Sequence, residues 1–332
     1  MNQWISDDSL KPSQDVLNWL LDPRQPAVRY HTLLRLLDRQ EDDWEVRTAH
    51  SSLTRIGWAH KILVSQKSGG FWESRKDLYR PKYTATIWRL IVLADLGLTG
   101  KDPRIKRPCE FFLNEYTRPD GGFDDSTNPL SRSEVCLTGN LARTLVRCGY
   151  LEDARVRAAY DWFVDSQMDD GGWHCFIELA AGRGTLDCWE ALSAYSVLPR
   201  RKWTRRIRRS IEKGAEFYLE RKLFQEGRRY LPWFRFHYPV HYYYDILVGL
   251  DVLTSLGYAD DKRLKPALEI LEGERRVDGT WDLDSIHPDL GPGADYRLKK
   301  RPKRFALERE NQPSKWITLT ALSVLKKVNE AS

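Results

Sequence analysis

The chain of 332 residues lacks several features that would place it in a common class of proteins. It has no apolar run of about 18 residues, so we expect no transmembrane helix. Its N-terminal segment has neither the basic nor the apolar region of a secretory signal, so we expect a cytoplasmic protein. It also has no phosphate-binding loop, no dinucleotide-binding fingerprint and no His-Glu-x-x-His motif, which removes the sequence support for those enzyme classes.

Cysteine and methionine are scarce, with 5 and 2 residues, and the net charge of +6 is a weak indicator of a partner. Apolar residues make up 41% of the chain, which is enough to form a core and excludes intrinsic disorder. Tryptophan and glycine, by contrast, are numerous, with 13 and 21 residues. Such a surplus of tryptophan points to an internal repeat.

A short glycine-rich turn that ends in an aromatic residue recurs along the chain. The copies lie at 68–71, 120–123, 170–173 and 278–281, with a degenerate copy at 226–230. Their aromatic residues are Phe71, Phe123, Trp173, Tyr230 and Trp281, at steps of 52, 50, 57 and 51 residues. Five turns at one period of about fifty residues indicate a repeat architecture.

Each turn lies between two helical patterns, a polar one before it and a more apolar one after it. The apolar patterns cover 84–97, 136–149, 187–198, 243–257 and 314–327, and an N-terminal pair covers 14–21 and 28–37. Helices that are apolar nearly all round are buried, and those with a polar face lie outside. The six pairs predict an all-α fold, an (α/α)6 toroid in one domain over residues 1–332. An open helical solenoid is the alternative.

The segment Gln167-Met168-Asp169-Asp170-Gly171-Gly172-Trp173 resembles the repeat of the prenyltransferase and squalene-cyclase superfamily. The chain is most similar to small stand-alone prokaryotic proteins with prenyltransferase/squalene-oxidase repeats, as the segments 80–84, 136–140 and 313–319 indicate. The resemblance implies an α/α toroid with an active cavity at its centre. It also implies a terpenoid cyclase or a prenyltransferase-like enzyme, although fold alone does not determine activity.

The chain departs from this family at its catalytic motifs. The Asp-x-Asp-Asp motif with which terpene cyclases protonate an alkene is missing, and Asp187 and Cys188 are adjacent where protein prenyltransferases have an Asp-x-Cys zinc pair. Those transferases also need a partner chain, so a partner protein is part of that interpretation. The alternative function is a non-catalytic toroid that binds a peptide or a lipid, with at most a structural zinc ion.

Three cysteines and a histidine lie where the toroid would bring them to one end of the barrel. Cys136 and Cys188 begin inner helices, Cys175 follows a Gly-Gly-Trp turn, and His241 precedes the next inner helix. Three thiols and an imidazole suit tetrahedral zinc, and His174 and Asp187 are alternative fourth ligands. Three separate buried thiols are the other interpretation.

The remaining candidates depend on a mouth at the N-terminal ends of the inner helices, whose dipoles favour anions. We expect a prenyl diphosphate or another anionic amphiphile there, covered by a lid formed by the long loop 282–312. The candidate substrate-binding residues are Tyr83, Trp88, Asn140, Arg183, Trp189, Tyr243, Lys315 and Trp316. The candidate acids and bases are Asp187, Glu190 and Asp245.

The densest run of positive charge, residues 200–209, surrounds Trp203. Arginines around an aromatic residue can bind nucleic acid. Here the pattern favours the solvated face of an outer helix, with Ile207 and Ile211 on its buried side, and we expect no nucleic-acid partner.

Overall fold

A computed structural model of the chain describes residues 12–126, 128, 131–175, 181–225, 230–286 and 305–331. These residues form helices joined by turns and irregular loops, and none of them belongs to a β-strand. Within the described loops, four isolated backbone bridges occur. None of the described helices is long and apolar enough to span a lipid bilayer.

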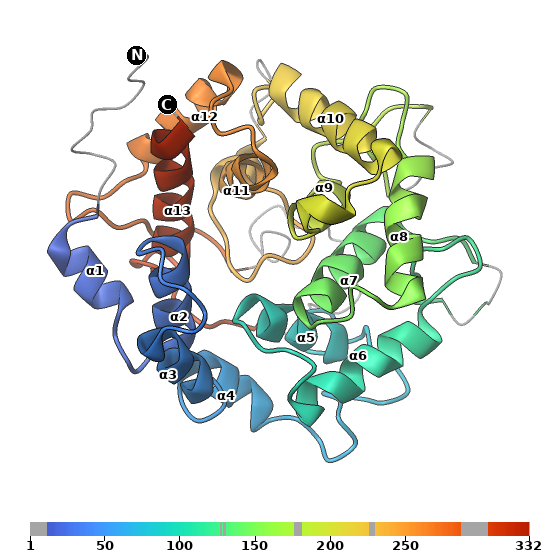
Figure 1. Ribbon diagram of the computed structural model, residues 1–332, viewed down its shortest axis with the longest axis horizontal. Helices are drawn as coiled ribbons and strands as arrows, with labels where there is room; N and C mark the ends of the chain where they lie inside the picture. The colour runs from blue at the N-terminus through green and yellow to red at the C-terminus, as the bar shows by residue number, and fades with distance from the viewer. Residues whose placement is uncertain are drawn as a thin grey trace.

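The helices form two concentric layers around one centre, as Figure 1 shows. The inner helices are α2 (Pro26–Arg35), α5 (Thr86–Asp95), α7 (Val135–Arg147), α9 (Glu190–Ser196), α11 (Ile246–Leu256) and α13 (Lys315–Ala331). The outer helices are α1 (Gln14–Leu20), α3 (Trp44–Ser52), α4 (Gly57–Leu63), α6 (Pro103–Glu115), α8 (Ala154–Asp165), α10 (Arg205–Glu220) and α12 (Lys265–Gly273). Because α13 packs against α2, the inner layer closes into a ring. The predicted α/α toroid is therefore confirmed, and the second outer position is divided between α3 and α4.

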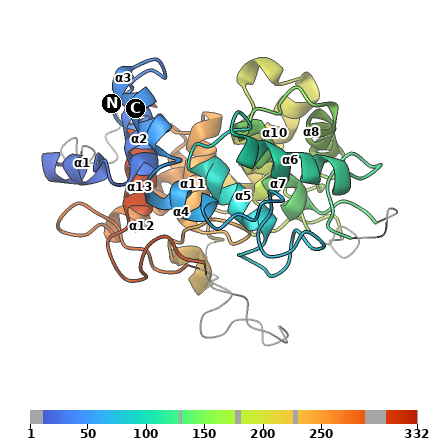
Figure 2. The ribbon, with the colours of Figure 1, turned by 90° about the horizontal axis from the view of Figure 1, so that it is seen from below.

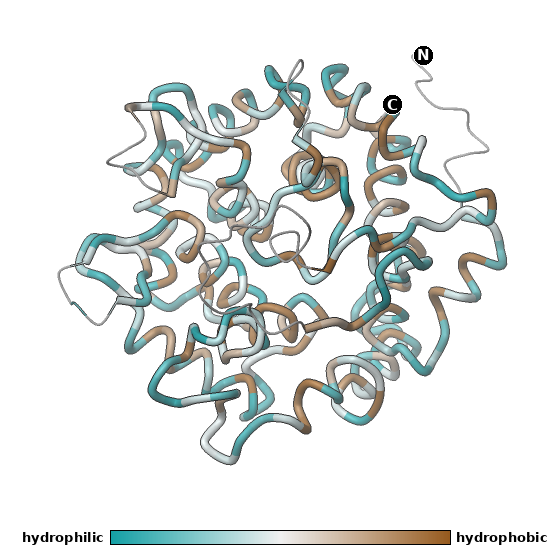
Figure 3. Tube along the Cα trace, turned by 180° about the vertical axis from the view of Figure 1, so that it is seen from behind, coloured by the Kyte–Doolittle hydropathy of each residue, from teal (hydrophilic) through white to brown (hydrophobic). Residues whose placement is uncertain are grey.

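The two layers differ in how much of each helix is buried. Residues Leu90 to Ala94 of α5 are all buried, whereas α10 buries only one face, which includes Ile207 and Ile211. Hydrophobic residues accordingly gather on the helices around the centre, and hydrophilic residues gather at the periphery (Figure 3). The burial of Ile207 and Ile211 confirms that the basic run 200–209, which includes η3 (Arg200–Lys202), is a solvated face.

The glycine-rich turns fasten each outer helix to the inner helix that follows it. Gly171 has a φ of +88°, a conformation that favours glycine, and Gly121 and Gly279 share it. After the turn, the Trp281 backbone N–H donates to Thr318 Oγ1 of α13 at 3.0 Å, and its indole N–H donates to the Leu271 carbonyl of α12 at 2.7 Å. Part of the tryptophan surplus thus has a structural cause, because in such a turn one buried indole joins the two helices of a pair.

In the first turn, the aromatic residue that has this role is Trp72 rather than Phe71. The backbone N–H of Trp72 donates to Thr86 Oγ1 at 3.1 Å, and its indole donates to the Ile62 carbonyl at 3.0 Å. Phe71 is only partly buried. The sequence pattern placed the first anchor one residue too early, because the Gly-Gly pair at 69–70 is followed by two aromatic residues.

A connection between η4 (Leu231–Phe234) and α11 crosses the centre of the ring. We call residues 236–245 the plug segment. Its His241 carbonyl accepts from Asn140 of α7, its Tyr242 carbonyl accepts from Trp189 beside α9, and its Tyr238 ring stacks on Trp316 of α13. It therefore contacts inner helices on several sides of the ring and closes the barrel near their N-terminal ends.

The predicted helices agree with the structure to within about three residues at most of their ends, the usual scatter of helix boundaries. Seen edge-on, the loops that precede α5 and α13 lie on the same side of the ring (Figure 2). The predicted lid, 282–312, has its ends joined by hydrogen bonds between Leu283 and both Asn311 and Gln312. Its central part, 287–304, lies outside the described residues, as does most of the degenerate turn at 226–230.

Candidate functional site

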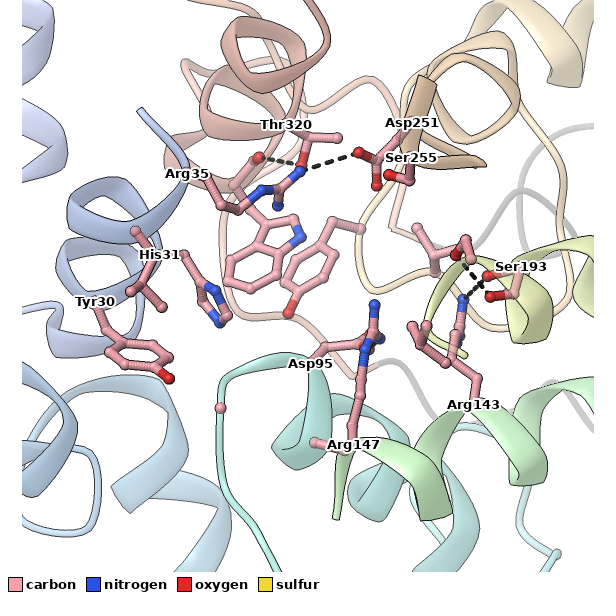
Figure 4. A pocket seen from close by; sticks show the side chains of 18 of the residues that line it. Tyr30, His31, Arg35, Asp95, Arg143, Arg147, Ser193, Asp251, Ser255 and Thr320 are labelled. Atoms are coloured by element: carbon pink, nitrogen blue, oxygen red, sulfur yellow. Dashed lines mark hydrogen bonds and ion pairs between the residues drawn. The ribbon is translucent and has the colours of Figure 1, made fainter. Parts of the chain in front are cut away.

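The ring encloses a cavity of about 770 Å³, which is within the range of small-molecule sites. Its walls come from all six inner helices or the residues beside them, and from the plug segment. The residues that matter below are His31, Arg35, Asp95, Arg143, Arg147, Trp189, Ser193, His237, Tyr238, Asp245, Asp251, Trp316 and Lys327. Figure 4 shows part of these walls, with the side chains of α2, α7, α9 and α11 converging on one space.

The cavity opens at the C-terminal ends of the inner helices, not at their N-terminal ends as predicted. Its exposed rim includes Glu41, Arg47 and Lys101, which follow α2 and α5. The other end is closed by the plug segment, with His241 packed between Tyr83 and Trp88 at ring distances of 5.3 and 5.2 Å. The predicted mouth is therefore wrong, because an aromatic segment of the chain fills it.

Two groups of ion pairs line the open half of the cavity. Asp251 accepts from Arg35 at 3.0 Å and from Lys327 at 3.2 Å. Burial alone would raise the pKa of Asp251, but the two cations outweigh it and lower the pKa to about 2. Arg147 pairs with Asp95. Arg35 and Arg147 lie in the last turns of their helices, where positive charge also opposes the negative end of the helix dipole.

Arg143 is a buried cation of this cavity, and it has no carboxylate partner among the described residues. Its guanidinium donates to Ser193 Oγ and to Asn140 Oδ1, both at 3.0 Å, while its Nε has no hydrogen-bond partner in the described part of the chain. Its side chain also lies over the Trp189 ring. Burial lowers the pKa of Arg143 to about 10, so it keeps its charge at neutral pH. The cavity thus holds a buried positive charge that an anionic ligand would neutralise.

His237 and Asp245 form a buried pair on the plug segment. The imidazole Nδ1 lies 2.7 Å from Asp245 Oδ2, and the same carboxylate accepts from the backbone N–H groups of His237 and Val248. Because a carboxylate can only accept, Nδ1 carries the proton, and Nε2 becomes the acceptor in the neutral ring. Nε2 has no partner among the described residues, although it is buried. The geometry therefore presents an oriented proton acceptor at the cavity wall.

The inner part of the cavity is apolar and aromatic. The Tyr238 and Trp316 rings stack at 4.6 Å, and the His31 ring meets the Trp316 ring edge-on at 5.5 Å. Burial lowers the pKa of His31 to about 3, which keeps it neutral at physiological pH. The cavity consequently combines an aromatic floor with charged walls towards its opening.

The predicted substrate-binding residues divide into two groups. Trp189 and Trp316 line the cavity, and Asn140 holds both Arg143 and the plug segment. The others do not line this cavity: Tyr83 and Trp88 pack on His241, Tyr243 lies near Lys82, Lys315 donates to the Trp19 carbonyl, and Arg183 lines a second pocket. The predicted group failed to converge because it was chosen for the plugged end.

The three predicted acids and bases are equally dispersed. Asp245 lines the cavity and also caps α11 through the Val248 N–H. Asp187 accepts from the Trp233 indole at 2.8 Å and lines the second pocket, of about 570 Å³, with Arg183 and His174. Glu190 is buried where α9 meets Gly139 of α7, and burial raises the pKa of its carboxyl well above its usual value.

Three of the four predicted zinc ligands lie together. The Cys188 thiol donates to the Cys175 sulfur at 3.4 Å, and the Cys136 thiol also hydrogen-bonds Cys175. These two hydrogen bonds lower the pKa of Cys175 to about 4. His241 is packed in the aromatic plug instead. Among the described residues, no three His, Cys, Asp or Glu side chains converge to hold a metal ion. The predicted set of four is therefore not brought together in this structure, because its imidazole lies among Tyr83 and Trp88.

The sequence interpretation missed Arg143, His237 and the paired carboxylates Asp95 and Asp251. Arg143, Asp95 and Asp251 could have been found from the sequence, since each lies within an apolar helical pattern, where an unpaired charge is costly. His237 gave a weaker signal, because it lies in a segment that read as a surface loop.

No known family profile matches the chain, and no curated protein matches it. Solved structures do match. A protein from Actinoplanes is 13% identical, with a TM-score of 0.48 and 98% of each chain covered. A variant of the type II terpene cyclase MstE from Scytonema, in complex with geranylgeranyl dihydroxybenzoate, is 16% identical, with a TM-score of 0.48 over 98% of this chain and 99% of that chain. Apo MstE is 15% identical, with a TM-score of 0.47 over 100% of both chains. At such identities and TM-scores, no residue role transfers.

Proposed function

We propose that this protein binds an anionic amphiphile of the isoprenoid class in its central cavity and carries out a proton-transfer reaction on it. One observation carries the proposal. The same cavity presents a buried guanidinium without a carboxylate partner among the described residues, Arg143, and an oriented imidazole, His237, whose Nε2 lacks a partner there. Perturbed or unsatisfied polar groups that converge in an apolar pocket favour a functional site.

The ligand class follows from the distribution of charge and apolar surface. An anionic head group would neutralise Arg143 and accept from its Nε, near Arg147. An apolar chain would then extend over the stacked Tyr238 and Trp316 rings. A prenyl diphosphate or a prenylated aromatic acid has both parts, so these are the substrates that we propose. A cation that develops on the chain would be stabilised by the aromatic faces.

Within this assignment His237 is the proton acceptor and Asp245 is its positioning residue. The Asp245 carboxylate fixes the imidazole orientation and favours the protonated ring that forms when Nε2 takes a proton. The reaction class is therefore a lyase or isomerase step that removes or moves a proton. Protonation of an alkene needs a neutral carboxylic acid, and the ion pairs of Asp251 with Arg35 and Lys327 keep that carboxyl charged.

These same ion pairs favour the second candidate, a toroid that binds the amphiphile without converting it. The two candidates share the ligand and differ only in turnover. We also propose that the chain is one of the small stand-alone prokaryotic repeat proteins that it resembles, since its described helices form one ring.

Binding is tested by titrating the full chain with geranylgeranyl diphosphate, geranylgeraniol and inorganic diphosphate. We expect the first to bind at least about ten-fold more tightly than the other two, because only it has both a head group and a chain. Arg143→Met should weaken its binding by about ten-fold or more, the usual effect of losing a hydrogen bond between charged groups. Arg147→Gln is the second variant if Arg143→Met does not fold. Arg183→Met is the matched control, because Arg183 lies outside the cavity.

Turnover is tested by product analysis after incubation with geranylgeranyl diphosphate or geranylgeranyl dihydroxybenzoate. His237→Gln should keep binding within about two-fold and lower turnover by about 100-fold or more, the contribution of a general base. Equal turnover by His237→Gln would remove the proton-transfer role. If wild type and His237→Gln both bind the ligand and neither forms a product, the protein is the second candidate, a toroid that binds the amphiphile without converting it. Loss of binding in Arg183→Met, with Arg143→Met unaffected, would move the site to the second pocket.

A further inference from the structure

The cysteines of the chain form two clusters in very different surroundings. Cys109 and Cys148 hydrogen-bond each other inside the core, with exposed fractions of 0% and 3%. Cys136, Cys175 and Cys188 lie where the turn after α8 meets α7 and α9, and both Cys136 and Cys175 are only partly buried. Neither cluster takes part in the proposed chemistry of the central cavity.

Cys175 is the centre of the second cluster. Its sulfur accepts from the Cys188 thiol at 3.4 Å and from the Cys136 thiol, and its backbone N–H donates to the Cys188 sulfur at 3.1 Å. A disulfide requires a distance of about 2.0 Å between two sulfurs, so Cys175 and Cys188 need to approach by little more than 1 Å. They are already in contact, and Cys175 belongs to an irregular turn rather than a helix.

This pair lies beside a polar pocket in the chain. The second pocket, of about 570 Å³, is lined by His174 and Asp187, the sequence neighbours of Cys175 and Cys188. Its other walls include Arg183, Arg221 and Thr185, so it is polar and admits water and small polar oxidants. Neither cysteine cluster lines this pocket or the central cavity, but only the second cluster has sequence neighbours in the wall of this pocket.

We propose that Cys175 and Cys188 form a reversible disulfide when the protein meets a peroxide, and that this is a modification site separate from the central cavity. The Cys175 sulfur attacks one peroxide oxygen, the O–O bond breaks, and Cys175 becomes a sulfenic acid while water leaves. The Cys188 sulfur then attacks the Cys175 sulfur, the S–O bond breaks, and a second water leaves. Overall, two thiols and one hydrogen peroxide give one disulfide and two waters. A dithiol restores the two thiols by exchange.

The third thiol, Cys136, hydrogen-bonds Cys175 but is not needed for this step, since the bond forms between Cys175 and Cys188. It makes a matched control, because Cys136→Ser keeps a hydroxyl donor at the same place. The core pair provides a second control within the same molecule.

The experiment treats the reduced full chain with a few equivalents of hydrogen peroxide, quenches with an alkylating reagent in denaturant, and maps the cysteines by mass spectrometry. We expect a peptide cross-linked through Cys175 and Cys188 that dithiothreitol removes, and loss of these two thiols at least about five-fold faster than loss of Cys109 and Cys148. Cys136→Ser should form the same cross-link. Cys188→Ser should accumulate a Cys175 sulfenic acid that dimedone traps.

Three results would overturn the proposal. The first is that wild-type protein forms no Cys175–Cys188 cross-link, a measurement that needs no variant. The second is that the core pair is oxidised as fast. The third is that purified protein retains more than about 0.5 zinc per chain, loses it in Cys175→Ser, and is protected from peroxide by it, because the cluster is then a metal site.

Discussion

The two ends of the ring are built from the same six helices, yet one is filled and the other is open. At the N-terminal ends, the plug segment lies among Tyr83, Trp88 and Asn140, and the His241 ring is enclosed by aromatic faces. At the C-terminal ends, no part of the described chain crosses the ring, and the space is lined by Arg35, Arg147, Asp251 and other polar side chains. The helix dipoles favour anions at the first end, but its access is blocked.

This difference shows that the amino-acid content of the connections, more than helix polarity, determines which end of this ring is open. The plug segment carries five aromatic residues within 236–245 besides two histidines, and such a segment gains more from burial than from solvation. At the open end the connections are short and polar. Basic side chains in the last helical turns neutralise the helix ends and supply the positive charge that the dipoles do not.

The largest expected effect is on the free energy of unfolding, which should fall much more for a substitution at the filled end of the ring than for one at the open end. Trp88 has an exposed fraction of 0%, and its indole donates to the Tyr79 carbonyl at 2.7 Å. Trp88→Ala should lower the free energy of unfolding by about 3–5 kcal/mol, because it leaves a cavity in packed surroundings. Thr320→Ala at the open cavity should cost less than about 1 kcal/mol. Urea unfolding measures both, and a cost below about 1 kcal/mol for Trp88→Ala would mean that the plug is not packed.

The next effect concerns His31, the neutral histidine in the inner part of the cavity. Because the pKa of His31 is about 3 in the folded chain and about 6.5 when unfolded, the unfolded state binds the proton first. The stability that neutral His31 gives is present above pH 6.5 and is lost as the pH falls towards 3. Between pH 7.5 and pH 5, wild type should therefore lose about 2 kcal/mol relative to His31→Phe. Parallel stability curves for the two proteins would show that the ring is hydrated and takes up a proton freely.

A smaller effect, in a lower pH window, belongs to Asp251. Its folded pKa of about 2 lies below the unfolded value, so its contribution is present above about pH 4 and is lost as the pH falls to 2. About a third of the side chain is exposed, at 32%, and solvent screening reduces the expected cost of Asp251→Asn to about 1 kcal/mol at pH 7. Glu115→Gln, in a more exposed ion pair with Arg75, is the control and should change stability by less than about 0.5 kcal/mol. A difference between wild type and Asp251→Asn that persists at pH 2 would contradict the ion-pair assignment.

The sequence predicted the ring well because its signals are local and repeated. Each turn has a glycine that needs a positive φ and an aromatic anchor, and each inner helix is apolar, so neighbouring residues determine them. The cluster of Cys136, Cys175 and Cys188 was also predicted, since it follows from equivalent positions in adjacent repeats.

The direction of the cavity could not be predicted in the same way, because it depends on one connection that departs from the repeat. The path of the plug segment is determined by contacts with Asn140, Trp189 and Trp316, which are distant in sequence. Because the plug segment occupies the centre of the ring, Tyr83 and Trp88 pack against it and do not line the cavity. The same segment places His237 in the cavity wall. The first anchor was predicted at Phe71 rather than Trp72 for a similar reason. The two aromatic residues are adjacent in sequence, and the contact with Thr86, 14 residues away, distinguishes them.

The smallest expected effect tests directly which end a ligand enters. Lys101 is exposed on the rim of the cavity, and Lys76 is exposed on the loop that leads to α5 at the opposite end. If an anionic amphiphile enters from the open end, Lys101→Gln should slow its association by about two- to three-fold at low salt. Added salt should remove the difference between the two rates, because it screens the field of a surface charge. Lys76→Gln has the same change of charge and should leave the rate unchanged. Stopped-flow tryptophan fluorescence with geranylgeranyl diphosphate measures both rates, and a slower rate in Lys76→Gln alone would place the entrance at the plugged end.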